Sequence, residues 1–123
     1  MSSLNASLDL VLDIAGVEMT ALIDFATGMV VASAGENSPV LPAVAATVAY
    51  EARSAVETYE QGTSRGELDE ISVTTARRFQ LMKVLEYQRG EGLLLYADVD
   101  LSRTNMALAA LQIEQLSSGL LAR

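Results

Sequence analysis

The side chains that most often carry enzymatic chemistry are missing from this sequence. Its 123 residues include no histidine and no cysteine. Ser-His-Asp triads, Cys-His nucleophiles, disulfides and thiolate zinc sites are therefore excluded by inventory. We predict that the chain has no catalytic residue of its own and that it uses neither a metal nor a cofactor.

Carboxylates are abundant, with 16 Asp and Glu against 8 Lys and Arg, but their spacing builds no reaction centre. Asp9 with Asp13, and Glu57 with Glu60, share the polar faces of expected helices. Paired carboxylates perform acid-base chemistry when one of them is desolvated, whereas water reaches both members of these pairs. We interpret them as solvated surface charges.

The segment Asp98-Val99-Asp100-Leu101-Ser102 is similar to the start of a calcium-binding loop. Such a loop has glycine at its sixth position and glutamate at its twelfth, where this chain has Arg103 and Ala109. Capping of the following helix explains these acids better than calcium binding does.

Nucleotide-binding loops are not present in the sequence either. A phosphate-binding loop needs glycines followed by lysine and serine or threonine, whereas Lys83 lies within an expected strand. Gly90-Glu91-Gly92 is too short for a dinucleotide fingerprint and is typical of a turn. The net charge of −8 disfavours nucleic acid as a partner and favours a basic protein surface.

Five of the eight basic residues gather around the third and fourth expected strands: Arg65, Arg77, Arg78, Lys83 and Arg89. One interpretation is protection of a sheet edge and balance of the nearby acids. The other is an arginine supplied to the nucleotide of a bound GTPase, for which Arg77 and Arg78 are the best candidates.

The strongest local pattern in the chain is a β-hairpin. Apolar residues at every second position from Val17 to Phe25 predict a strand. Ala26-Thr27-Gly28 interrupts this alternation, and Gly28 can adopt the positive φ that a three-residue hairpin loop requires. The apolar run Met29-Val30-Val31-Ala32 then returns antiparallel to the first strand.

Three helices are expected around this hairpin. The first begins at Ser3, includes Ala15 in its apolar stripe and ends at Gly16; the last runs from about Arg103 to Leu121 behind a cap at Asp98, Asp100 or Ser102. The second runs from Pro42 to about Gln61. Its apolar arc comprises Val44, Ala45, Val48, Ala49, Ala52, Ala55, Val56 and Tyr59.

Three further strands are expected between the second and last helices. They span Leu68 to Ala76, Phe79 to Tyr87 and Leu93 to Ala97, with Arg77-Arg78 as a tight reversal. The predicted order is therefore α-β-β-α-β-β-β-α in a single α+β domain, residues 1–123. No apolar stretch is long enough to span a membrane and no signal peptide precedes the domain, so we expect a cytoplasmic protein.

Two apolar features are not explained by a monomer. The alanines of the second helix allow close approach of another helix or sheet, and a symmetry mate can complete that surface. Leu108 and Leu111 project away from the core stripe of the last helix, which includes Met106. We expect the first helix to cover these two leucines, with a protein partner as the alternative.

The hairpin from Val17 to Gly35, the alanine-rich helix from Pro42 to Gln61 and the closing pattern from Gly92 to Leu120 resemble the Roadblock family. These are dynein light-chain-like domains that include the bacterial MglB-like regulators of small GTPases. The resemblance covers nearly the whole chain and is distributed, since no single motif is diagnostic. It implies a five-stranded antiparallel sheet with the first and last helices on one face and the second helix on the other.

The resemblance also implies a homodimer formed by the third strand and second helix, which uses its composite surface to bind a small Ras-like GTPase, a motor or a scaffold. The expected dimer interface comprises Ala45, Ala49, Ala52, Val56, Ile71 and Val73. The expected partner-binding residues are Glu51, Ser54, Glu57, Thr58, Arg77 and Arg78. Such a module regulates its GTPase without hydrolysing nucleotide itself.

Two alternatives remain open at this stage. A profilin-like or PAS-like sensor of small molecules needs an internal pocket, and Tyr50, Tyr59, Tyr87 and Tyr96 are the side chains that can line one. A structural scaffold subunit needs only the interaction surface. Fold-level analogy favours a partner-binding module over both alternatives.

Overall fold

The computed structural model describes the backbone of residues 3–24, 27–35, 40–59, 70–85 and 92–121. It describes the side chains of these residues except 3–5, 40–43, 53, 56–59 and 118–121. The element order matches the predicted α-β-β-α-β-β-β-α. The elements are α1 (Ser3–Leu12), β1 (Val17–Asp24), β2 (Val30–Gly35), α2 (Val40–Tyr59), β3 (Glu70–Thr74), β4 (Arg78–Leu85), β5 (Leu93–Asp100) and α3 (Met106–Leu121).

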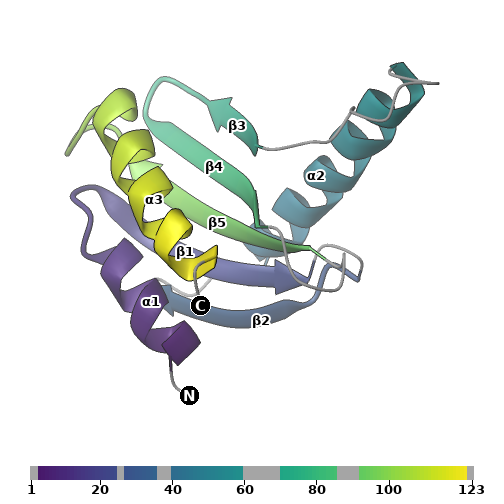
Figure 1. The fold of residues 1–123 in the computed structure, drawn as a ribbon. Coiled ribbons are helices and arrows are strands. Elements are labelled where there is room, and N and C mark those ends of the chain that lie inside the picture. The colour runs from purple at the N-terminus through teal and green to yellow at the C-terminus, as the bar shows by residue number, and fades with distance from the viewer. Residues whose placement is uncertain (1–2, 25–26, 36–39, 60–69, 86–91, 122–123) are drawn as a thin grey trace.

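The five strands form one sheet in the order β2-β1-β5-β4-β3, and every neighbouring pair is antiparallel. Helices α1 and α3 cover one face and α2 crosses the other (Figure 1). This arrangement confirms the predicted sheet and the predicted distribution of the helices over its two faces.

Each face of the sheet has its own apolar core. Under α1 and α3 the core includes Leu8, Val11 and Ile113, together with strand residues such as Leu22 and Leu95. Under α2 the core is built from strand residues and alanines, namely Met19, Ala21, Ile23, Met82, Leu94, Tyr96, Ala45, Ala46 and Ala49. Because helices cover both faces, the central strands β1 and β5 are buried on both sides.

The hairpin forms as predicted. Gly28 has a φ of 78°, and the N–H of Asp24 donates to the carbonyl oxygen of Met29 at 2.8 Å. The N–H of Gly28 donates to the Asp24 carbonyl oxygen at 2.7 Å and closes the turn. Phe25 lies outside the described residues, so the strand is seen only as far as Asp24.

Each of the three helices differs from the prediction at one boundary or more. Helix α2 begins at Val40, two residues before the predicted Pro42. Helix α1 ends at Leu12, and Ala15 is exposed. Tight turns replace the helix here, because the N–H of Ile14 donates to the Val11 carbonyl oxygen, three residues back, at 3.0 Å. Helix α3 begins at Met106, where the side chain of Asn105 accepts a hydrogen bond from the N–H of Leu108 at 2.8 Å. Asn105 is therefore the cap, and the predicted caps at Asp98, Asp100 or Ser102 are wrong.

The predicted reversal at Arg77-Arg78 is displaced by one residue. Arg78 is the first residue of β4, paired with Asp100 of β5, and the turn is closed by the Thr75 N–H donating to the Arg78 carbonyl at 2.9 Å. Strand β5 also runs three residues beyond the predicted Ala97. The longer pairing places Asp98 inside the sheet, where its carboxylate faces Arg78.

Candidate protein-interaction site

Strand β3 is an edge strand whose side chains are partly exposed on the α2 face. Ile71 pairs with Met82 and Val73 pairs with Gln80, and directly paired residues of antiparallel strands point to the same face. Met82 belongs to the core under α2, so Ile71 and Val73 face α2 as well. Ile71 packs against that core, whereas Val73 is 40% exposed.

Helix α2 turns its smallest apolar residues toward the sheet. Ala45, Ala46 and Ala49 are buried, while Val44 and Val48 are exposed to 53% and 37%. The predicted apolar arc placed both valines and Ala55 on the buried side of the helix. That prediction is wrong for these three residues, because Ala55 is exposed as well. The larger apolar side chains described on the helix, Val44, Val48 and Tyr50, are thus exposed, whereas its buried alanines face the sheet.

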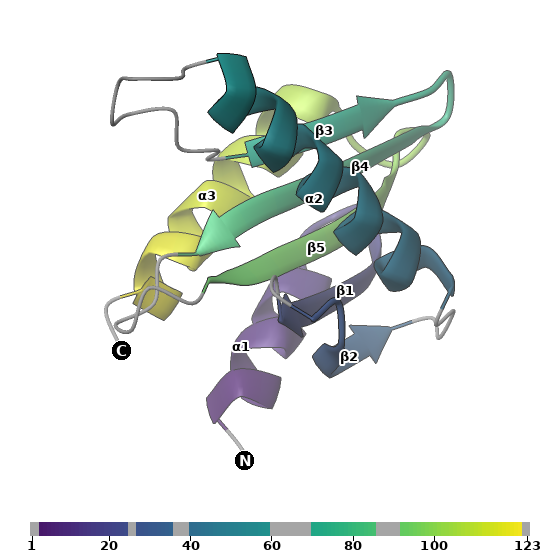
Figure 2. The same ribbon diagram turned by 90° about the vertical axis from the view of Figure 1, so that its right-hand side faces the viewer.

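The path of α2 leaves one side of it open. The helix packs chiefly on β1 and β5. It crosses the sheet diagonally in Figure 2, and in Figure 1 its C-terminal end stands away from the sheet. Among the described residues, a helix flank without cover and a strand edge without a pairing strand therefore lie on the same face of the molecule.

The expected dimer-interface residues divide into two groups. Ala45 and Ala49 are buried within the protomer by the sheet, and Ala52 is half-buried. Ile71 and Val73 lie at the β3 edge, where a second chain has access. The side chain of Val56 lies outside those described.

Arg78 is held by two carboxylates at one end of the sheet. Its Nη2 lies 2.6 Å from Oδ2 of Asp98 and 2.8 Å from Oε1 of Glu18, and its Nε donates to Oδ1 of Asp98 at 3.3 Å. These hydrogen bonds, first of all that to Asp98, raise the pKa of Arg78 further above its ordinary value. The guanidinium is thus fixed within the protomer.

A β-bulge brings Glu18 to this cluster. Val17 pairs with Val99 and Met19 pairs with Asp98, so Glu18 is an extra residue in β1. Sequence reasoning missed both Glu18 and Asp98 as partners of Arg78, because the three residues meet only through strand pairing.

Tyr96 lies beside the arginine cluster and is fully buried. Its hydroxyl accepts a hydrogen bond from Nε2 of Gln80 at 3.2 Å, and burial raises the pKa of Tyr96 to about 12, with the negative charge of Asp98 adding to the shift. Of the other tyrosines considered as pocket lining, Tyr50 is exposed to solvent. Tyr87 and the side chain of Tyr59 lie outside the described part of the chain.

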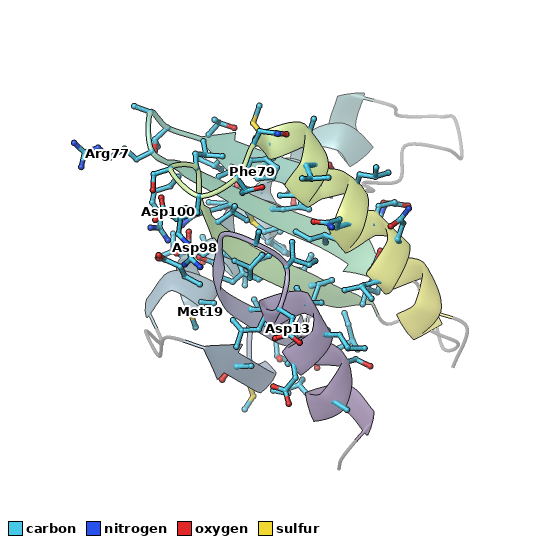
Figure 3. The ribbon with its side chains drawn as sticks, turned by 90° about the vertical axis from the view of Figure 1, so that its left-hand side faces the viewer. Asp13, Met19, Arg77, Phe79, Asp98 and Asp100 are labelled. Carbon is cyan, nitrogen blue, oxygen red and sulfur yellow. The ribbon has the colours of Figure 1, made fainter. Side chains whose placement is uncertain are left out.

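Arg77, in the exposed turn before β4, and Asp100, at the end of β5, flank the cluster. Figure 3 shows Arg77 projecting outward at the end of the sheet where Asp98 and Asp100 lie. Asp100 accepts hydrogen bonds from the backbone N–H and the hydroxyl of Ser102, and these, the backbone bond first, hold the pKa of Asp100 below its usual range. The acids of the calcium-like segment therefore serve strand pairing and a local turn.

The expected partner-binding residues of α2 lie on its outward side where they are described. Glu51 is exposed and Ser54 is half-buried. The side chains of Glu57 and Thr58 lie outside those described. Among the described residues, no three His, Cys, Asp or Glu side chains are grouped so that they could hold a metal ion, and no described helix is long and apolar enough to cross a membrane.

Comparison with known proteins identifies the fold. No family model matches the sequence, and no curated protein matches it either. The structure is similar to Myxococcus xanthus MglB, with 19% identity, a TM-score of 0.76 and coverage of 99% of this chain and 94% of MglB. It is also similar to an MglB with a tetrameric arrangement, with 18% identity, a TM-score of 0.70 and coverage of 95% of this chain and 84% of that one.

A third similar structure is a Roadblock/LC7 domain from Streptomyces avermitilis, with 13% identity and a TM-score of 0.72. The alignment covers 94% of this chain and 92% of that domain. The five-stranded sheet, the helix arrangement and these likenesses show that the chain has the Roadblock fold.

Proposed function

We propose that this protein is a non-enzymatic homodimeric module that binds and regulates a small Ras-like GTPase in the cytoplasm. The proposal rests on one observation: the edge strand β3 and the exposed Val44 and Val48 of α2 lie on the same face of the molecule. The likeness to MglB and to a Roadblock/LC7 domain supports it, because the family resemblance implies self-association and GTPase regulation. One similar MglB has a tetrameric arrangement, which also favours self-association.

The dimer forms by antiparallel pairing of two β3 strands across a two-fold axis. An unpaired edge exposes backbone donors and acceptors, and pairing two identical edges satisfies both at once. Val73 then meets its counterpart on the α2 face, and Val44 and Val48 are covered by the second α2. Ala45 and Ala49 contribute indirectly, because their small side chains determine the distance between α2 and the sheet.

The GTPase binds the composite surface of the two α2 helices. Glu51, Ser54, Glu57 and Thr58 supply an acidic and polar surface that receives a basic switch region. If an arginine acts in trans, Arg77 is the better candidate, because Arg78 is already bound to Asp98 and Glu18. The protein biases the nucleotide state of its partner and hydrolyses no nucleotide itself.

Self-association is tested by light scattering, which should give about twice the chain mass of 13.1 kDa. Val73→Lys places a charge at the β3 edge and should yield monomers, while Val31→Lys on the opposite edge strand β2 is the matched control and should leave the dimer intact. Equal masses for the wild-type and Val73→Lys proteins would contradict a β3 interface.

GTPase regulation is tested by mixing the protein with the small GTPase encoded nearest to its gene. GTP hydrolysis or nucleotide release should change in the mixture, with no turnover by this protein alone, and Glu51→Lys should abolish the change while the dimer persists. Binding without a change in either rate would favour a scaffold. Retention of a small molecule through purification would favour a sensor.

A further inference from the structure

The face covered by α1 and α3 presents leucines that the core does not use. Leu10 on α1 is 51% exposed, and Leu108 and Leu111 on α3 are 45% and 55% exposed. Leu108 and Leu111 are three positions apart, so they are neighbours on one side of α3. We call these three side chains the leucine patch. The prediction that α1 covers Leu108 and Leu111 is wrong.

The exposure of the leucine patch does not result from a poorly formed core. Leu8 and Val11 of α1, and Ala109 and Ile113 of α3, are fully buried on the inner sides of the same helices. The two helices lie side by side over the sheet (Figures 1 and 3). Exposed apolar side chains that group on one face outside a complete core are candidates for an interaction surface, whereas single ones are ordinary.

The charged residues within the two helices that carry the leucine patch are all acidic. Helices α1 and α3 contain no lysine or arginine. Asp9 and Asp13 are exposed on or just after α1, and Asp13 faces the viewer in Figure 3. The charge of Glu114 on α3 is balanced within the protomer by the buried Lys83, whose Nζ lies 3.0 Å from its Oε1, whereas Asp9 and Asp13 are exposed acids that a basic partner could approach.

We propose that the leucine patch docks a cationic amphipathic helix of a partner protein, with its apolar stripe on the leucines and its basic residues beside Asp9 and Asp13. A second copy of this chain would bring the same acids to the contact, and an anionic membrane surface would be repelled by them. The site lies on the opposite face from α2. It therefore stays accessible in the proposed dimer and does not depend on that dimer.

The probe is an amidated helical peptide of leucine and lysine with one leucine face and one lysine face. In NMR titrations it should shift the amide signals of α1 and α3, and Leu108→Ser with Leu111→Ser should weaken binding about tenfold. Val30→Ser with Val31→Ser is the matched control, because it removes two exposed apolar side chains from β2. This control should bind as the wild type does.

Charge is tested separately, with variants that do not disturb the apolar surface. Asp9→Asn with Asp13→Asn should weaken the lysine peptide several-fold, and a peptide with glutamate in place of every lysine should not bind. Shifts confined to α2, or equal affinity for the Leu108→Ser, Leu111→Ser protein with unchanged circular dichroism, would overturn the proposal. A fall in the oligomer mass of that variant would overturn the proposal in favour of a second copy of this chain. If the wild type binds phosphatidylglycerol vesicles and the variant does not, a membrane is favoured instead.

Discussion

The two faces of the sheet are covered by helices of opposite character. On one face, α1 and α3 bury Leu8, Val11 and Ile113 and so provide large side chains to the core. On the other face, the described core residues of α2 are all alanines, and its Val44 and Val48 are exposed. An alanine buries far less apolar area than a leucine or isoleucine, so the α2 layer gains less from its own sheet.

This difference indicates which face is complete within one chain. The α1 and α3 layer is stabilised by its own core, and its leucine patch is additional surface. The α2 layer retains the exposed Val44 and Val48 and lies on the face that Ile71 and Val73 of the edge strand β3 also share, so in the proposed dimer a second chain would add the burial that the alanines do not provide. The stability of α2 should therefore depend on protein concentration, whereas the stability of the other layer should not.

The largest expected effect comes from the core under α3. Ile113→Ala removes a fully buried side chain and should lower the free energy of unfolding by about 2 to 5 kcal/mol at every protein concentration. Urea unfolding of dilute and concentrated samples measures this. Val48→Ala is the comparison on α2. In the dilute sample it should lower the free energy of unfolding by only about 0.5 kcal/mol. Equal losses for the two variants would show that the faces do not differ in this way.

Overpacking the alanine face should have the next largest effect. Ala49 is fully buried between α2 and the sheet, so Ala49→Leu should lift the helix and cost about 1 to 3 kcal/mol. It should also weaken the proposed dimer, since the outward valines move with the helix. Ala107→Leu, at an exposed position of α3, is the control. An unchanged melting temperature for Ala49→Leu would contradict close packing of α2.

Much of the fold could be predicted because its signals are local. The alternation from Val17 onward, the glycine at residue 28 and the apolar run that follows specify the hairpin without reference to the rest of the chain. The helix boundaries were less accurate, because the cap at Asn105 competes with three other polar residues just before it. Capping preferences alone do not separate such neighbours.

The candidate site was harder to predict because it depends on contacts between distant segments. Valine and alanine are both apolar, so helical periodicity could not show which of them faces the sheet in α2. The ion pairs of Arg78 require the bulge at Glu18 and the full length of β5, neither of which leaves a sequence signal. Arg78 was therefore assigned to a turn and to a partner, although its own protomer binds it.

A smaller effect of opposite sign is expected at Thr20, in the central strand β1. Its hydroxyl is fully buried and has no hydrogen-bond partner within the part of the chain that the structure describes. Thr20→Val keeps the shape of the side chain and removes the unpaired hydroxyl, so it should raise the free energy of unfolding by about 1 kcal/mol. Thr20→Ser keeps the hydroxyl and loses the methyl group, and it should be destabilising. A loss of stability in Thr20→Val would mean that the hydroxyl has an acceptor in solution.

The mildest test of the difference between the faces is the ionisation of Tyr96, which is buried under α2. Its pKa is raised from 10.0 to about 12, first by burial and then by the charge of Asp98. Because the folded pKa lies above the unfolded one, the stabilisation by neutral Tyr96 is complete below pH 10.0 and is lost as the pH rises toward 12. Ultraviolet titration should show one late phenolate step that Tyr96→Phe removes, and the variant should lose less stability than the wild type over this range. If α2 were loosely packed and admitted water, the late step would be missing from the wild-type titration as well.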